Sequence, residues 1–348
     1  MSGPTVGKNM KVPAHSLSNS ERISRGLRVM FRTMRPRHDD LILPEIHYTS
    51  QGDEYHVYYP AGKPLRTVVL IYGMTIEGAQ DGRVLKFARA CANAGLKVIV
   101  PHLPGLMDFT VTPGDMQRLE HILGSLNLES ETKMALIGFS TGGGYALLLA
   151  ANPQLADKIG PLILFSPIYD ARDVFERIHA PADPPPHTPK EWDQYYWGQY
   201  VVAFRNRAQL GLSHSALSSL HIFLADYDRH TLETKRAFYE AYIAPHNLLE
   251  LSGLLNEGPA LDQLSARGHL AEVTSPVFIL HDASDRVVPP DHSRHMHAEL
   301  ALRGAASGQD MLITPWLSHV VMQKTGSPAE LLKIVSFVSE LFREVQHG

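Results

Sequence analysis

A serine enclosed by glycines at a junction of strand and helix is the feature that most constrains this chain. Gly138 and Gly142 flank Ser140. An apolar run of strand length, 133–137, precedes them, and a helix-forming segment, 145–151, follows. The glycines are needed because a tight, strained turn leaves no room for side chains beside the serine. Such a turn presents the hydroxyl to a cleft and directs backbone N–H groups toward it, so the context predicts that Ser140 is a nucleophile.

The composition narrows the class of protein. Hydrophobic residues make up 44% of the 348 residues and charged residues 20%, which is ordinary for a soluble globular protein. A net charge of −4 gives no reason to expect nucleic acid as a partner. Cys91 is the single cysteine, so an internal disulfide is excluded and a reducing compartment is favoured. Because residues 1–20 lack the apolar core of a secretion signal, we expect a cytoplasmic protein.

Beyond Pro44, apolar runs of strand length alternate with helical patterns. We expect strands at 55–59, 67–72, 97–101, 133–139, 162–165, 277–280 and 311–314. Continuous apolar runs of this kind suit parallel strands that are covered on both faces. Helices are expected around 84–91 and 115–126, and a last helix opens at Ser327 with a capping box and a proline at its first position. The alternation predicts an α/β fold with a mostly parallel central sheet flanked by helices.

The segment between Asp170 and Pro276 interrupts this alternation. It contains no convincing strand, begins with a proline-rich piece at 181–186, and has helical stretches around 232–242 and 246–255. An aromatic cluster follows the prolines, namely Trp192, Tyr195, Tyr196, Trp197 and Tyr200. We expect 171–273 to form a mainly helical cap whose aromatics serve mostly as its core. Residues 46–170 and 274–348 are then the α/β core.

Residues 1–45 precede the core as a polar tail and a basic amphipathic helix. The helix is expected at Arg22–Arg35, where apolar side chains recur at helical spacing and arginines occupy the other faces. We prefer the interpretation that it docks on the surface of the domain. The alternative is an interfacial helix that brings the protein to an anionic membrane.

A serine nucleophile needs a base beside it, and the base needs an orienting acid. After the strand at 277–280 comes a loop with Asp282 and Asp285, and the strand at 311–314 leads to His319 before the last helix. This order resembles that of the α/β-hydrolase superfamily, whose acid and base follow the serine. The resemblance implies that Asp285 is the acid and His319 the base. Asp282, which replaces the family's usual glycine, is the alternative acid.

The resemblance also implies where the oxyanion would bind. One backbone donor is the N–H of Thr141, and the second is the N–H of Met74, after Gly73. Here the chain departs from the family's common His-Gly pair, because Tyr72 replaces the histidine. The resemblance covers about residues 50–346, including a family-like turn at 102–105, and the cap lies outside its recognisable part.

A metal site is a rival interpretation of the histidine-rich segment 291–297. His292 and His295 share a face of a helix, but His297 does not, and no matching ligand set is evident. We therefore interpret the segment as a solvated helix and expect neither a metal nor a cofactor.

These observations together predict a capped serine hydrolase of the carboxylesterase or lipase kind. Its substrates would be small-molecule esters with small to medium, rather apolar acyl groups. The same groups could also act on thioesters, lactones or C–C bonds, or transfer the acyl group, since fold and triad do not select the substrate. A protein of another class, one that binds a ligand without catalysis, is the remaining alternative. Acyl chain length, leaving group and oligomeric state are not encoded in any motif we can read.

Overall fold

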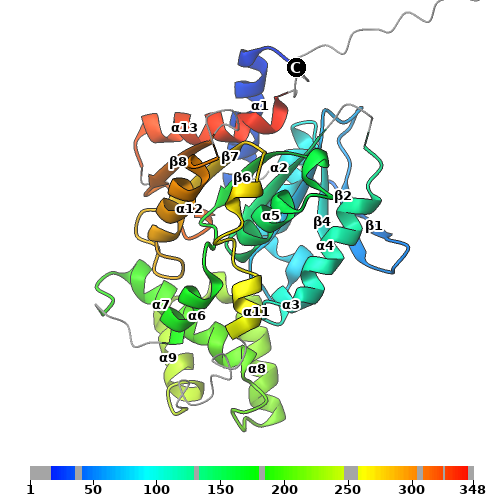
Figure 1. Ribbon diagram of the computed structural model, residues 1–348. Coiled ribbons are helices and arrows are strands. Elements are labelled where there is room, and N and C mark those ends of the chain that lie inside the picture. The colour runs from blue at the N-terminus through cyan, green and yellow to red at the C-terminus, as the bar shows by residue number, and fades with distance from the viewer. Residues whose placement is uncertain are drawn as a thin grey trace, which may run out of the picture.

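An eight-stranded, mostly parallel sheet forms the centre of the structure (Figure 1), a computed structural model that describes residues 17–35, 41–128, 133–179, 185–246, 258–303, 309–323 and 326–343. The strands are β1 (Glu45–Tyr48), β2 (Glu54–Tyr58), β3 (Thr67–Ile71), β4 (Lys97–Pro101), β5 (Met134–Phe139), β6 (Ile159–Phe165), β7 (Val277–Asp282) and β8 (Gln309–Thr314). Their order is β1-β2-β4-β3-β5-β6-β7-β8. Only the pairs β1–β2 and β2–β4 are antiparallel. The predicted fold class is confirmed.

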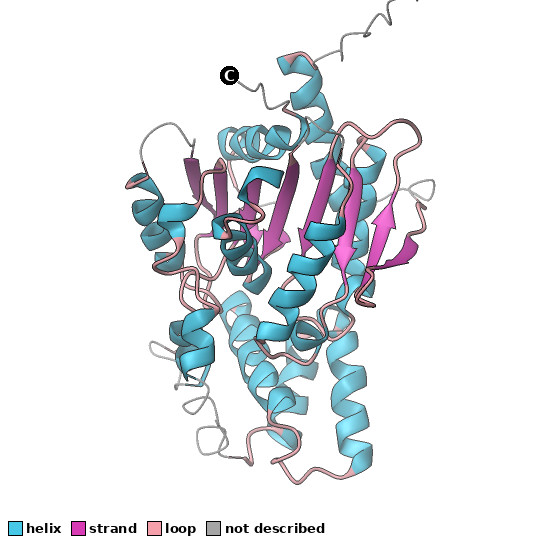
Figure 2. Cartoon of the chain, turned by 45° about the vertical axis from the view of Figure 1, so that its right-hand side comes forward, coloured by secondary structure: helices cyan, strands magenta, loops and turns pink. Residues whose placement is uncertain are grey.

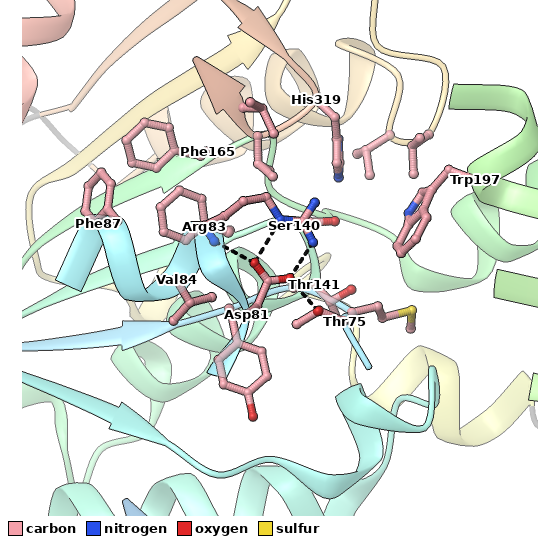
Figure 3. Close-up of a pocket in the computed structure, with 18 of the residues that line it drawn as sticks. Thr75, Asp81, Arg83, Val84, Phe87, Ser140, Thr141, Phe165, Trp197 and His319 are labelled. Carbon is pink, nitrogen blue, oxygen red and sulfur yellow. Dashed lines mark hydrogen bonds and ion pairs between the residues drawn. The ribbon is translucent and has the colours of Figure 1, made fainter. Parts of the chain in front are cut away.

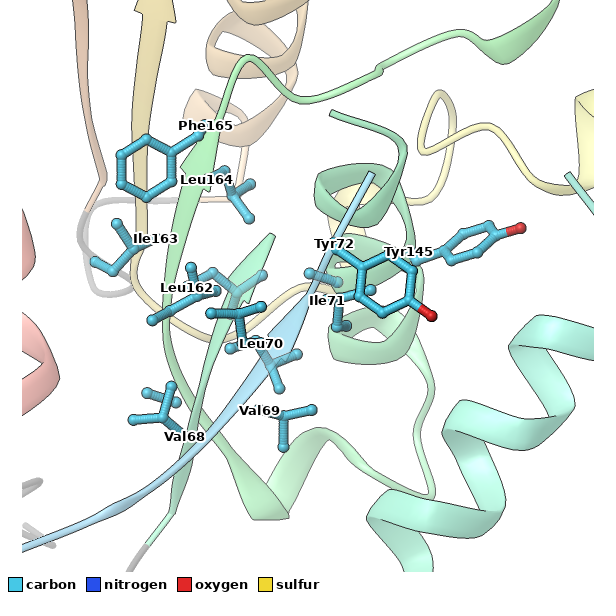
Figure 4. Close-up of a cluster of buried hydrophobic side chains, with 14 of the residues drawn as sticks. Val68, Val69, Leu70, Ile71, Tyr72, Tyr145, Leu162, Ile163, Leu164 and Phe165 are labelled. Atoms are coloured by element: carbon cyan, nitrogen blue, oxygen red, sulfur yellow. The ribbon is translucent and has the colours of Figure 1, made fainter. Parts of the chain in front are cut away.

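Helices cover both faces of the sheet (Figure 2). They are α2 (Gly82–Asn93), α3 (Pro104–Met107), α4 (Pro113–Ser125), α5 (Thr141–Ala151), α12 (Asp291–Ala301) and α13 (Pro328–Ser339). The apolar strands fill the core because neither face of a covered sheet meets water. In β3, the side chains of Val68–Ile71 are fully buried, and they lie near those of β6 and Tyr145 (Figure 4). Cys91, on the apolar face of α2, is also fully buried.

The chain between β6 and β7 forms the helices at the bottom of Figure 1, which we call the helical insertion. Its described helices are α6 (Ala171–His179), α7 (Pro189–Arg205), α8 (His214–Ala225), α9 (Leu232–Tyr242) and α11 (Gly258–Gln263). Tyr196, Tyr200 and Phe223 belong to a second apolar core inside it. The helix expected around 246–255 lies almost entirely outside the described residues. Most of the aromatic cluster therefore packs within the insertion itself.

The amphipathic helix near the N-terminus is α1 (Asn19–Met34), opened by a capping box between Ser18 and Glu21. It lies beside α2 and α13. Val29 and Met30 are buried against the core, so the helix is docked on the domain, as the preferred interpretation had it. The membrane contact considered above stays a prediction.

Gly26 allows the close contact between α1 and α13. A Cβ atom at this position would lie 2.9 Å from the carbonyl oxygen of Val335, which is backbone and cannot move aside easily. We expect Gly26→Ala to lower the free energy of unfolding by about 1–3 kcal/mol through overpacking, less the gain in helix propensity. Urea unfolding followed by circular dichroism measures this change in the free energy of unfolding.

Gly124 in α4 provides the matched control. It is also helical, but a Cβ atom there would meet no atom within 4 Å. Gly124→Ala should not lower the free energy of unfolding, because alanine is the better helix former. Equal stability of the two variants would contradict the docking geometry.

Candidate active site

Ser140 occupies the turn that joins β5 to α5. Its φ of 52° and ψ of −118° lie in a region that residues other than glycine rarely adopt. The backbone around it fixes this conformation: the Ser140 N–H donates to the Phe165 carbonyl at 2.9 Å, and the Ser140 carbonyl accepts from Gly143 N–H at 2.9 Å. The strain is thus held by neighbouring strand and helix backbone, which is typical of a functional residue.

The predicted motif glycines are required by close contacts between backbones. A Cβ atom on Gly142 would lie 2.3 Å from the Ile71 carbonyl oxygen, and one on Gly138 would lie 2.5 Å from Gly143 Cα. A Cβ atom on Gly73 would lie 3.0 Å from the Ser140 Cβ. A side chain at position 138 or 142 would therefore displace backbone, whereas one at position 73 would make a tight contact with the serine.

Two backbone segments, the start of α5 and the loop after β3, lie beside the serine. Helix α5 begins at Thr141, so its first N–H groups and the positive end of its dipole point out of the helix beside Ser140. The loop after β3 supplies Met74, which lines the same cavity as Ser140. Where the family's histidine would stand, Tyr72 is buried and its hydroxyl accepts a hydrogen bond from Leu103 N–H at 2.8 Å. The replacement thus braces the neighbouring loop.

A carboxylate holds the loop that carries Met74 (Figure 3). The Thr75 hydroxyl donates to Asp81 at 2.6 Å, and Arg83 pairs with the same carboxylate at 2.6 Å. Burial acts to raise the pKa of Asp81, but hydrogen bonds and charge from Arg83 outweigh it and lower that pKa. The loop is therefore anchored by an ionised group.

His319 lies in the turn between two short strands, β9 (Leu317–Ser318) and β10 (Val321–Met322), which the sequence did not indicate. Its φ is also positive, at 51°. The His319 Nδ1 is 2.7 Å from the Asp285 Oδ2. Asp285 is buried, and its Oδ1 accepts from Val287 N–H at 2.9 Å and Val288 N–H at 3.0 Å. The pair has the geometry of an imidazole oriented by a carboxylate.

The charge of Asp285 is stabilised by its surroundings. Burial acts to raise the pKa of the carboxyl, but the charge of His319 and the hydrogen bond from it outweigh burial and lower that pKa. His281 is 3.7 Å from the same carboxylate, but its nitrogens bond to Val288 O and Ser293 Oγ. Burial lowers the pKa of His281, so it remains neutral. His319 is thus the imidazole whose Nδ1 is hydrogen-bonded to the Asp285 carboxylate.

The alternative acid, Asp282, makes different contacts. Its carboxylate accepts from Lys190 Nζ at 2.6 Å, from Gln194 Nε2 at 3.1 Å and from the backbone N–H of His319 at 2.8 Å. It therefore holds the histidine's backbone, while the histidine's ring is bonded to Asp285.

A cavity of about 330 Å³ connects these groups. Ser140, His319, Thr141 and Met74 all line it, and most of its other walls are apolar. Phe87, Phe139, Phe165, Val174, Ile178 and Val288 are among the apolar residues. Figure 3 shows Ser140 and His319 facing one region of this cavity, with Trp197 beside it. A nucleophile and base at an apolar pocket are the arrangement that acyl transfer requires.

Several lining residues were not predicted. Met30, Thr33 and Met34 come from α1, so this helix forms part of the cavity wall. Trp197 comes from the insertion and lines the cavity in addition to packing on Phe109 and Tyr227. The helical spacing of the methionines indicated a buried face but could not show what that face borders.

The histidine-rich segment is helix α12, and it is not simply solvated. His292 is buried, with Nε2 2.9 Å from Asp173 Oδ2 and Nδ1 accepting from Tyr169 N–H at 3.2 Å. This corrects the expectation of a solvated helix, because one side of α12 packs on the core. Among the residues that the structure describes, no group of His, Cys, Asp and Glu is arranged to hold a metal ion.

Comparison with known proteins assigns the family. A sequence profile described as alpha/beta hydrolase fold matches residues 66–304, which is more than half of the chain. The protein therefore belongs to the alpha/beta hydrolase fold family, as the resemblance predicted. No curated protein matches it in sequence.

Solved structures share the fold at low identity. A puromycin hydrolase is 13% identical with a TM-score of 0.50, over 87% of this chain and 40% of that chain. The meta-cleavage product hydrolase from Pseudomonas fluorescens IP01 is 17% identical with a TM-score of 0.46, over 86% and 97%. Candida antarctica lipase A is 14% identical with a TM-score of 0.45, over 77% and 70%. The chain spans about two fifths of the acylaminoacyl peptidase it matches (42%). The similarity to the puromycin hydrolase, with its TM-score of 0.50, shows the fold alone.

The described helices were also compared with the requirements of a membrane span. None of them combines the length and the apolar composition needed to cross a bilayer.

The strained backbone at Ser140 gives a prediction that does not depend on activity. Glycine adopts a positive φ without steric cost, whereas alanine keeps the strain of about 1–3 kcal/mol. We expect Ser140→Gly to be more stable than Ser140→Ala, even though glycine gains more entropy on unfolding. The midpoint of urea unfolding of the two variants measures the difference. A clearly less stable glycine variant would show that the turn is not strained as described.

Proposed function

We propose that the protein is a serine hydrolase that cleaves carboxylic esters with small to medium apolar acyl groups. The observation that carries the proposal is the His319–Asp285 pair, whose histidine lines the same apolar cavity as the strained Ser140. A buried, ionised carboxylate that orients an imidazole is what a serine nucleophile needs.

In the proposed reaction, the Ser140 hydroxyl attacks the ester carbonyl while His319 accepts its proton. Asp285 remains ionised, keeps Nδ1 of the ring protonated and stabilises the imidazolium that forms. The backbone N–H groups of Thr141 and Met74 bind the oxyanion. His319 then donates the proton to the leaving alcohol, which leaves an acyl-enzyme. Water, activated by the same histidine, releases the acid and restores Ser140.

The cavity supports an apolar acyl group of limited size. Its volume of about 330 Å³ is near the lower end of the range for small-molecule pockets, roughly 300–1,000 Å³. Arg83 and Asp81 both line it, but they neutralise each other in an ion pair. Aromatic and aliphatic side chains from the core, α1 and the insertion make up most of the remaining wall.

Alternatives for the same groups are the hydrolysis of thioesters, lactones or C–C bonds and the transfer of an acyl group to an alcohol. In each of these reactions, the serine attacks a carbonyl carbon. A panel of esters, thioesters and lactones of graded length, with and without an added alcohol, distinguishes them. If the protein binds a ligand without catalysis, it will turn over none of the substrates in this panel.

Ser140→Ala is the direct test of the proposal. We expect it to lower turnover of short p-nitrophenyl esters by at least about 10³-fold, since loss of one triad member removes most of the rate enhancement. Asp285→Asn should also lower it strongly, because the ring loses its orienting charge. A fluorophosphonate probe should label the wild-type protein at Ser140 and leave Ser140→Ala unlabelled. Wild-type protein that is neither labelled nor active would refute the proposal.

The contribution of α1 to the cavity predicts the chain-length preference. Met34→Trp should fill space along this wall and disfavour the longer acyl chains. The loss of room for two methylene groups, at about 0.8 kcal/mol each, corresponds to a roughly tenfold lower kcat/KM for these longer chains. Phe31→Trp on the exposed face of the same helix is the control and should leave the preference unchanged. Identical chain-length profiles for the two variants would exclude α1 from the acyl site.

A further inference from the structure

We infer that Asp282 is a positioning residue that couples the helical insertion to the backbone of His319. The inference rests on the proposed function, because it concerns the orientation of the proposed base, His319. At this position the chain departs from the family's usual glycine, so the contacts are a property of this chain.

Asp282 is fully buried at the end of β7, and both of its oxygens are occupied. Oδ2 accepts from the His319 N–H at 2.8 Å and from Gln194 Nε2 at 3.1 Å. Oδ1 accepts from Lys190 Nζ at 2.6 Å and from Ser284 N–H at 3.0 Å. Lys190 and Gln194 lie one turn apart on α7, so a single carboxylate joins the insertion to the histidine turn.

The first turns of α7 hold the loops of both proposed catalytic residues. Lys190 also donates to the Leu317 carbonyl at 3.0 Å, just before His319. Gln194 Oε1 accepts from Arg286 N–H at 3.0 Å, just after Asp285, and Arg286 pairs with Glu191 at 3.1 Å. Acid loop and histidine turn are thus fixed to one helix surface outside the sheet.

The backbone of His319 depends on such external contacts. Its positive φ is unfavourable for a residue with a Cβ atom. Asp282 accepts from its N–H, and the Ser166 hydroxyl donates to its carbonyl at 2.7 Å. Loss of either contact allows the turn to relax, which rotates the imidazole away from Ser140.

Lys190 decides whether Asp282 can serve this role. A buried carboxylate that loses its cationic partner is strongly destabilised, so it moves toward water or its loop rearranges. Either change weakens the bond to the His319 N–H. Removal of Lys190, a side chain of the insertion, should therefore disturb a histidine that it does not touch.

Lys190→Met tests the coupling, with Lys235→Met as the matched control. Lys235 also forms a 2.6 Å ion pair, with Asp193 of α7, but its contact lies entirely within the insertion. Its side chain is 7% exposed against 30% for Lys190, whereas its partner Asp193 is 42% exposed and Asp282 is fully buried. We expect Lys190→Met to lower kcat for a p-nitrophenyl ester by up to about 10²-fold, the effect of a small misplacement, with KM little changed. Lys235→Met should leave kcat near that of the wild type, and Lys190→Arg should recover part of the loss.

Hydrogen exchange of the segment 317–322 supplies a readout that needs no activity. The amide of His319 should exchange faster in Lys190→Met than in the wild type or in Lys235→Met. Equal effects of the two lysine variants on kcat and exchange would overturn the coupling and leave only a general loss of stability. If the wild-type serine is not labelled by a fluorophosphonate, the proposed function fails instead, while the exchange rates still report on the coupling.

Discussion

The close contact between the first turn of α5 and the end of β3 is the constraint on which the rest of the site depends. The hydrogen of Gly142 points at the Ile71 carbonyl, where a Cβ atom would lie at 2.3 Å. This contact brings the helix N-terminus, the serine and the loop of Met74 to one point. It also forces Ser140 into a positive φ, because a relaxed turn would move the helix away from the strand. The position of Ser140 and the strain in its backbone therefore both result from this one contact.

Features that are local in the sequence could be predicted from it. The turn at Ser140 needs only its own glycines and the adjoining strand and helix, and the loops of Asp285 and His319 follow strands that are continuous apolar runs. The order of these strands in the parallel sheet then brings the loops to one edge. The choice between Asp282 and Asp285 could not be made from the local sequence, because the two carboxylates lie only three residues apart, one at the end of β7 and one in the loop after it. It depends on which carboxylate meets a ring and which meets Lys190, about a hundred residues away in the chain.

The cavity wall depends still more on distant contacts. Met30 and Met34 could be placed on the apolar face of a helix, but what that face borders is decided by Gly26 packing on α13. Trp197 shares a cluster with residues that are core of the insertion, and only the packing of α7 turns it toward the cavity. Helical periodicity indicates that one face of a helix is buried. The pattern is the same whether that face packs against a core or borders a substrate pocket.

Two buried carboxylates in one short loop pose an electrostatic problem. Asp282 and Asp285 would repel each other and favour protonation if they shared one cation. The fold separates their partners: Lys190 from the insertion faces Asp282, and His319 from the core faces Asp285. Since His281 beside them is kept neutral by burial, the charge of Asp285 is directed to a single ring. The insertion thus supplies the positive charge that faces Asp282, and the acid–base pair and the cavity wall both depend on the same helix, α7.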